Sequence, residues 1–181
     1  PDTIVRIYSM SKVFTCVAAL QLVDDGVVKL DDPITKWLPE FASPLVFTGG
    51  TVDAPVLEPL ARPITVKNLL NHTAGLTYDF VHESPVQELY RRQDLWAASS
   101  MSEFVQKAAT LPLLSQPGEA FHYSIADDVL GAVVERCAGV PFAQYVKERI
   151  TAPLGMVDTD FDVPEAQRAR LATLATTVDG K

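Results

Sequence analysis

The sequence predicts a mostly helical chain that folds as one compact domain or as a large part of one. Apolar residues recur at helical spacing in several stretches, and these stretches begin at capping residues and end at glycine or proline. With 181 residues, 48% of them hydrophobic, the chain is long enough to bury a core of its own.

The first predicted helix spans residues 10 to 25. Its apolar face consists of residues one, three or four positions apart: Val13, Phe14, Val17, Leu20 and Val23. Gly26 follows as a C-terminal stop, and Ser9 lies at the N-terminal edge of the helix. The next stretch, Leu30 to Arg62, is rich in Pro, Gly and Asp and is predicted to form surface loops.

Two further helices are predicted from their N-caps. Thr65 is expected to cap a short helix through Leu69 and Leu70, which ends at the turn-like residues 72–75. Ser102 is expected to cap the second, which carries Phe104, Val105 and Leu111.

The last two helices lie beyond residue 120. Ser124, with Asp127 three residues later, has the character of an acidic capping box for a helix that Gly139 ends. Pro141 opens the final helix. The inner faces of the two helices are predicted to hold Val129, Leu130, Val133, Val134, Phe142, Tyr145, Val146 and Ile150.

Composition excludes several classes of partner. The 15 basic and 23 acidic residues give a net charge of −8, with no cluster of basic residues to neutralise phosphates, so nucleic acid is not expected as a partner. No apolar run is long enough for a membrane span. The chain begins with Pro1 and Asp2 rather than Met and is expected to be a cut piece, so it carries no information on a leader.

Neither cysteines nor histidines predict a metal site or a cofactor. Cys16 and Cys137 both fall in apolar helical stretches, which favours buried thiols over a disulfide. His72, His82 and His122 have no metal-ligand spacing with carboxylates or thiols.

Ser9 and Lys12 form a Ser-x-x-Lys motif, which places a hydroxyl and an amine one helical turn apart. A serine becomes a good nucleophile when a neighbouring base takes its proton. Lysine can do this when neutral, and lowering its pKa from about 10.4 to near 7 costs roughly 4 to 5 kcal/mol. Burial and the helix N-terminus are expected to lower it. The same spacing also fits a Ser9 that only caps the helix and a solvated Lys12.

Tyr123 follows the turn Pro117-Gly118 and directly precedes a predicted helix, so it can project from a loop held by rigid structure. The same tyrosine could equally be an amphipathic packing residue. The chain has no Gly-x-Ser-x-Gly elbow, and His72 is interpreted as a structural hydrogen-bonding residue.

Four blocks, taken in order, resemble the class C β-lactamase superfamily of penicillin-recognising serine hydrolases. They are YSMSKVFTCVAALQLVDDGVVKLDDPITKWLPEF, ITVKNLLNHTAGLTYDF, PGEAFHYSIADDVLGAVVE and ITAPLGMVDTDF. The resemblance implies that Ser9 is acylated, that Lys12 is its proton acceptor and that Tyr123 is a second acid/base of the Tyr-x-Asn element.

Two departures from the family pattern matter. Ile125 occupies the third position of Tyr-x-Asn and is expected to be a substrate-binding residue that suits an ester better than a lactam. Together with TYDF, SPVQELYRR and YSIADDVLG, this resembles the family VIII carboxylesterases. The third family element, Lys-Thr-Gly or a His-x-Gly or Trp-x-Gly variant, does not occur after Tyr123. Without its oxyanion donor, worth about 2.7 to 4 kcal/mol, this chain alone is expected to be nearly inactive.

The resemblance implies a multi-domain α+β fold of the β-lactamase/transpeptidase type, with an antiparallel sheet flanked by helices and a mainly helical subdomain. Residues 1–60 and 156–181 are expected to form part of the α/β domain and residues 61–155 the helical subdomain, with the C-terminal sheet strands missing. Exposed apolar faces would then favour self-association or pairing with that missing part.

The expected function is a carboxylesterase acting on short acyl esters through an acyl-enzyme on Ser9. The alternatives are a β-lactamase or D-alanyl-D-alanine carboxypeptidase and a catalytically dead binding homologue. The substrate would be a small ester or lactam. An esterase-like protein would be cytoplasmic and a lactamase-like one periplasmic, and the sequence does not decide between them.

Overall fold

Helices dominate the computed structural model of the chain, which describes residues 2–81 and 83–174. The α-helices are α1 (Ser11–Asp24), α2 (Val66–Leu70), α3 (Pro85–Gln93), α4 (Met101–Ala109), α5 (Ala126–Ala138) and α6 (Phe142–Val146). Shorter helical turns are η1 (Tyr8–Met10), η2 (Ile34–Lys36), η3 (Pro39–Ala42), η4 (Leu95–Ala97), the π-helical η5 (Lys147–Thr151) and η6 (Glu165–Arg170). The strands are β1 (Leu45–Gly50) and β2 (Pro55–Pro59).

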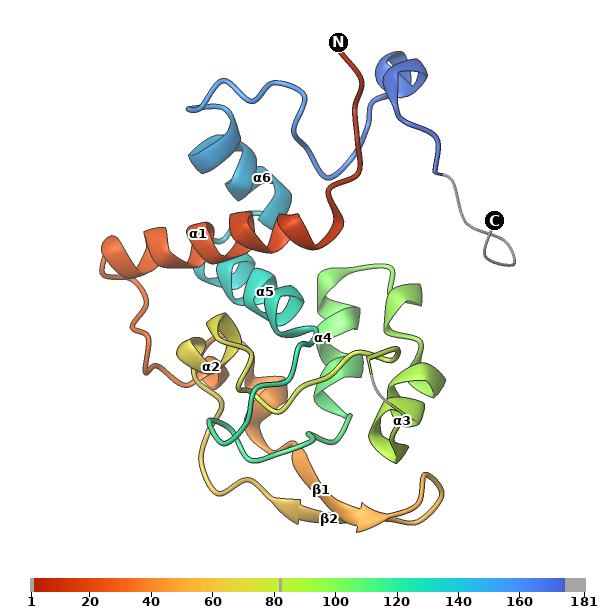
Figure 1. Cartoon of the computed structure of the whole chain (residues 1–181). Helices are drawn as coiled ribbons and strands as arrows, with labels where there is room; N and C mark the ends of the chain where they lie inside the picture. The colour runs from red at the N-terminus through yellow and green to blue at the C-terminus, as the bar shows by residue number, and fades with distance from the viewer. Residues whose placement is uncertain (1, 82, 175–181) are drawn as a thin grey trace.

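Helix α1 crosses α5 and also packs against α6 (Figure 1). The predicted helix is confirmed, but its predicted apolar face is wrong in part, because of its five residues only Phe14 and Val23 pack against the core. The buried residues are Thr15, Ala18, Ala19 and Leu22, whereas Val13 and Leu20 are 64% and 43% exposed. Small alanines allow close approach to α5, and a hydropathy pattern gives such residues little weight.

The loop prediction for residues 30–62 is wrong in part, because β1 and β2 form an antiparallel hairpin there. The hairpin lies at the opposite end of the fold from the chain's N-terminus (Figure 1). Pro55 and Pro59 bound β2, and prolines are tolerated there because a two-stranded sheet has only edge strands. Strand β1 is tied to the core through Leu113, whose N–H donates to the Leu45 carbonyl at 2.8 Å.

The short helix α2 is confirmed together with its cap. The Thr65 side chain accepts from the Asn68 N–H, and the Asn68 side chain accepts in turn from the Thr65 N–H, so a full capping box forms. For α4 the cap is Ser100 rather than Ser102, because the Ser100 side chain accepts from the Glu103 N–H. Helix α3, capped by Ser84, was not predicted.

The end of α5 and the helix after it follow the prediction. Gly139 ends α5 in the left-handed region at φ 71°, and α6 begins directly after Pro141. The inner faces of the two helices are buried at Val129, Leu130, Val133, Val134, Tyr145 and Val146, and Phe142 is partly buried against the core. Ile150 is also buried but lies in η5, beyond the end of α6. Cys16 and Cys137 are partly buried and free.

The beginning and end of the described chain lie side by side (Figure 1). Ile4 bridges Leu171 in parallel fashion, and the Ala172 N–H donates to the Ile4 carbonyl at 2.8 Å. The predicted division into 1–60 with 156–181 and 61–155 stays a prediction, and Pro1 and residues 175–181 lie outside the described residues.

Candidate active site

Ser9 and Lys12 are presented by the junction of η1 and α1. Tyr8 has a positive φ of 46°, which is unusual for a side chain of this size and turns the chain just before Ser9. Ser9 itself is exposed. Lys12 lies in the first turn of α1, and its Nζ donates to Ser9 Oγ at 3.3 Å.

Tyr123 reaches the same serine from the other side, since its hydroxyl donates to Ser9 Oγ at 2.6 Å. The three side chains singled out by the sequence therefore meet at one oxygen, across 114 residues of chain. Ile125 does not join them. Its side chain is 0% exposed and packs in the core at the start of α5.

Backbone hydrogen bonds hold Tyr123 in place by joining the turn at residues 72–75 to the segment before it. The N–H groups of Leu114, Gly118 and His122 donate to the carbonyls of Gly75, Thr73 and His72 at 2.7, 2.7 and 2.8 Å. The two segments approach so closely at Gly75 that a Cβ there would lie 2.3 Å from the Ser115 carbonyl oxygen. Glycine also suits the positive φ of 82° at this position.

His72 packs against the ring of Tyr123 and is itself held by polar contacts at both of its ring nitrogens. Its Nε2 lies 3.0 Å from a carboxylate oxygen of buried Asp127, and its Nδ1 lies 3.3 Å from Ser124 Oγ. Its ring centroid is 5.1 Å from that of Tyr123. The structural interpretation of His72 fits these contacts. The capping box predicted for Ser124 and Asp127 does not form, because Asp127 turns to His72 and Ile125 is the N-cap of α5.

The pKa of Lys12 is shifted opposite to the expected direction. Burial lowers it, but hydrogen bonds and charge interactions with Tyr78 and Tyr123 outweigh burial, so the pKa of Lys12 lies above its ordinary value. The ammonium lies 5.5 Å from the ring centroid of Tyr78 and 5.0 Å from that of Tyr123. The helix N-terminus and partial burial are therefore too weak to make Lys12 neutral in this geometry.

The two tyrosines around Lys12 differ in acidity. The hydrogen bond with Ser9 lowers the pKa of Tyr123, and Lys12 adds to the effect. Burial raises the pKa of Tyr78 to about 12 against the pull of Lys12. Tyr123 is thus the more acidic phenol, and Lys12 is an ammonium poised to stabilise its anion.

Sequence reasoning did not assign Tyr78 a role. The residue lies in the segment TYDF and contacts Tyr123 through its ring at 5.4 Å. Its proximity to Lys12 depends on the turn at residues 72–75, which no local pattern predicts. In the sequence, the aromatic residues of the TYDF segment were the only indication that Tyr78 could have a role.

No group of three or more His, Cys, Asp or Glu side chains that could hold a metal occurs within residues 2–81 and 83–174. His82 lies outside the described residues. In the same part of the chain, no helix has the length and apolar character needed to cross a membrane.

Comparison with known proteins gives consistent matches. A family model described as Beta-lactamase matches residues 1–181. The lovastatin esterase of Penicillium rubens is 38% identical over 176 residues, which cover 96% of this chain and 44% of that protein. Esterase EstB of Burkholderia gladioli is 37% identical over 172 residues, covering 92% and 41%.

Among solved structures, unliganded simvastatin synthase (LovD) from Aspergillus terreus superimposes with a TM-score of 0.80 at 33% identity, covering 99% of this chain and 45% of that one. The chain therefore spans less than half the length of these relatives. The matches confirm the predicted β-lactamase/transpeptidase-like α+β fold, of which this chain supplies a mostly helical part.

Proposed function

We propose, because the chain belongs to the beta-lactamase family, that the whole protein is a carboxylesterase that acts on short acyl esters through an acyl-enzyme on Ser9. The observation that carries the proposal is the pair of contacts to one oxygen: Ser9 Oγ lies 2.6 Å from the Tyr123 hydroxyl and 3.3 Å from Lys12 Nζ. The similarity to two esterases supports the choice of ester over lactam.

In the proposed reaction, Ser9 Oγ attacks the ester carbonyl carbon while its proton passes to the oxygen of Tyr123. The Lys12 ammonium stabilises the phenolate that accepts this proton. The carbonyl oxygen becomes an oxyanion, held in part by the Ser9 N–H. Collapse of this intermediate breaks the bond to the alcohol, which leaves with the proton from Tyr123. Water, deprotonated by the same pair, then hydrolyses the acyl-enzyme and restores Ser9.

Hydrolysis of a short-chain nitrophenyl ester by the whole protein, compared with its Ser9→Ala variant, tests this proposal. Loss of the nucleophile should lower kcat/KM by more than about 10³-fold. Ser11→Ala is the matched control, because Ser11 lies two residues after Ser9, at the first position of α1, and should keep the activity. Ester hydrolysis that survives Ser9→Ala would refute the proposal.

Two further measurements address the alternatives. A chromogenic cephalosporin separates a β-lactamase from an esterase by relative turnover. A fluorophosphonate probe that labels Ser9 in the whole protein excludes a catalytically dead binding homologue. If the probe does not label Ser9 and the ester is not hydrolysed, the catalytically dead binding homologue would be favoured.

The exposed apolar face of α1 supports a second part of the proposal, that this chain associates with the remainder of the whole protein or with itself. Val13, Val17 and Leu20 of α1 are exposed, as is Met10 directly before the helix. Light scattering on the separate chain should detect self-association, which serine at Val13 and Leu20 should reduce. A monodisperse monomer would contradict it.

A further inference from the structure

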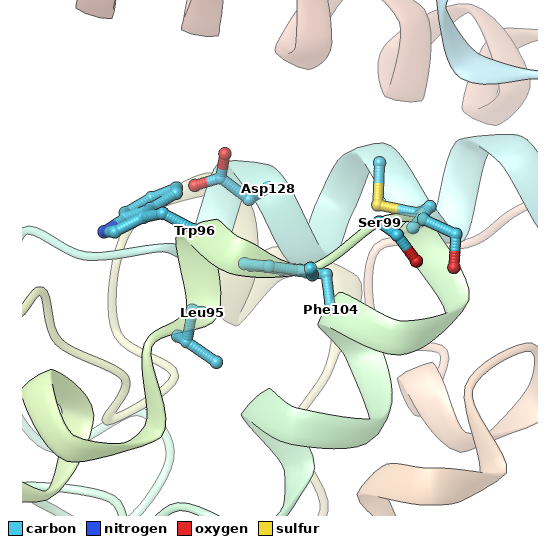
Figure 2. A pocket seen from close by; sticks show the side chains of 8 residues that line it. Leu95, Trp96, Ser99, Phe104 and Asp128 are labelled. Carbon is cyan, nitrogen blue, oxygen red and sulfur yellow. The ribbon is translucent and has the colours of Figure 1, made fainter.

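A pocket of about 350 Å³ lies between residues 95–104 and the start of α5. Figure 2 shows the Asp128 carboxylate and the Trp96 indole together at one end of this pocket, with Phe104 and Ser99 lining the remainder. The volume falls in the range of small-ligand sites, which begins near roughly 300 Å³.

A continuous row of aromatic rings joins this pocket to the Ser9 site. Tyr123, which donates to Ser9, contacts Tyr78 at a centroid distance of 5.4 Å. Tyr78 stacks on Trp96 at 6.1 Å, and Trp96 contacts Phe104 at 6.3 Å. Trp96 is 54% exposed, so part of its indole is available to a ligand. Tyr78 itself is buried, so the row places the pocket beside the Ser9 site without offering a path along its ring. Lys12, which donates to Ser9, also interacts with the charge of Asp128 in the pocket, so a substrate with its ester at Ser9 would reach the pocket over the exposed part of Trp96.

Among the described residues that line the pocket, Asp128 is the only ionisable one. Burial raises the pKa of this carboxyl to about 6, against the opposing charge of Lys12 on α1 and with a further increase from Asp127 on its own helix. His72, in the turn after α2, acts in the same direction as Lys12. Asp128 is thus ionised at neutral pH, at a cost that a bound cation would offset.

Aromatic faces and a partly buried carboxylate are the two features that favour an organic cation. A trimethylammonium or alkylammonium group is attracted to the face of an indole ring and to a carboxylate, most strongly where water is excluded. The net charge of −8 adds a weak attraction at long range. A neutral acyl chain would fill the same volume but would add nothing to the charge interaction that Lys12 gives Asp128.

We infer that this pocket binds the cationic head of an ester substrate, so that the protein prefers esters carrying a quaternary or protonated amine. The inference rests on the proposed esterase function and names the substrate class for the same site. The rival explanation is that Asp128 only stabilises the N-terminus of α5, where acidic residues are favourable. That role would affect helix stability and leave the choice between esters unchanged.

The test uses two esters of the same shape with the whole protein: the butyrate of 2-(trimethylammonio)ethanol and its carbon isostere, 3,3-dimethylbutyl butyrate. They differ at one atom, which is a cationic nitrogen in the first ester and a neutral carbon in the second. We expect kcat/KM to favour the cationic ester by roughly tenfold or more, since cation–π contacts and a charged partner together are worth at least that. Asp128→Asn should reduce this ratio to within about twofold of unity, and Trp96→Leu should reduce it in part.

Asp31→Asn is the matched control, because it removes one exposed carboxylate from the loop between α1 and η2 and changes the net charge equally. It should leave the ratio unchanged. Using a ratio cancels any effect of Asp128 on Lys12 that is common to both esters. Should Asp128→Asn fail to fold, Trp96→Leu still provides the test, since Trp96 is largely exposed.

Equal kcat/KM for the two esters in the wild type, or a preference that survives Asp128→Asn, would overturn the inference while leaving the esterase proposal intact. If neither ester is hydrolysed, the esterase proposal fails, and calorimetric titration with benzyltrimethylammonium decides on the pocket separately. Binding that Asp128→Asn weakens supports a cation site, and absence of binding rejects it.

Discussion

Replacing Tyr123 by phenylalanine removes one hydroxyl and keeps the ring. The lost group is the one that donates to Ser9 Oγ at 2.6 Å, and it belongs to the phenol whose pKa is lowered. The ring contacts with His72 and Tyr78, at 5.1 and 5.4 Å, stay in place, so the thermal unfolding midpoint should not change. The change therefore isolates proton transfer from packing.

The expected loss follows from the role of the hydroxyl. A positioned general acid/base contributes about 10²- to 10⁴-fold, so kcat/KM on a nitrophenyl ester should fall by that factor, or about 2.7 to 5.4 kcal/mol of barrier. Tyr78→Phe is the matched comparison, because Tyr78 interacts with Lys12 at the same cluster. It removes only a hydrogen bond of about 0.5 to 1.5 kcal/mol, which corresponds to roughly a two- to twelvefold loss.

The pH profile gives a second, independent measure. In the Tyr123→Phe variant, Lys12 is the remaining proton acceptor at Ser9; it loses the raising contribution of Tyr123 and keeps that of Tyr78. The phenol that it replaces as acceptor has a lowered pKa. The rise of kcat/KM with pH should therefore move to higher pH than in the wild type. A variant that keeps kcat/KM within about threefold, or that keeps the wild-type pH profile, would refute Tyr123 as the proton acceptor.

Two predictions concern stability. A side chain at a positive φ alone lowers the free energy of unfolding by about 1 to 2 kcal/mol. Gly139→Ala has open space around its Cβ and should show only this loss in urea unfolding. Gly75→Ala should lose more, because its Cβ would meet the Ser115 carbonyl. Equal costs would contradict the close approach. Glu40→Gln should cost roughly 1.5 to 3 kcal/mol at pH 7, since Arg136 donates to both Glu40 oxygens. Because this contact lowers the pKa of Glu40, its contribution is present above the unfolded-state pKa and should be lost as the pH falls through the folded-state value. A stability deficit of the Glu40→Gln variant relative to the wild type that persists unchanged in acid would disprove that.

The elements that sequence predicted well carry their signals locally. Thr65 and Gly139 determine the start of α2 and the end of α5 through caps that involve only neighbouring residues. The exposed face of α1 and the β1–β2 hairpin were mispredicted because burial depends on partners elsewhere in the chain. Strand β1, for example, is tied to Leu113, more than 60 residues away.

The residues of the candidate site show the same difference between local signals and contacts with distant parts of the chain. The three-residue spacing of Ser9 and Lys12 on one helix is a local property, so sequence alone predicts their proximity. Family resemblance was needed for Tyr123, because no physical rule brings residue 123 to residue 9. Neither approach assigned roles to Tyr78 and Asp128, whose pKa values respond to Lys12 because tertiary packing brings them near it.

The backbone bond between the Leu114 N–H and the Gly75 carbonyl, 2.7 Å long, marks where the chain leaves and rejoins the frame around Tyr123. Everything between, including α3 and α4, departs from and returns to adjacent points. The excursion is part of the core, because Val86 and Val105 within it are fully buried. It carries Trp96 and Phe104 of the pocket and also Tyr78, which contacts Tyr123. One continuous stretch of chain therefore supplies both the pocket and a neighbour of the reacting groups, so a change in its packing would be felt at both.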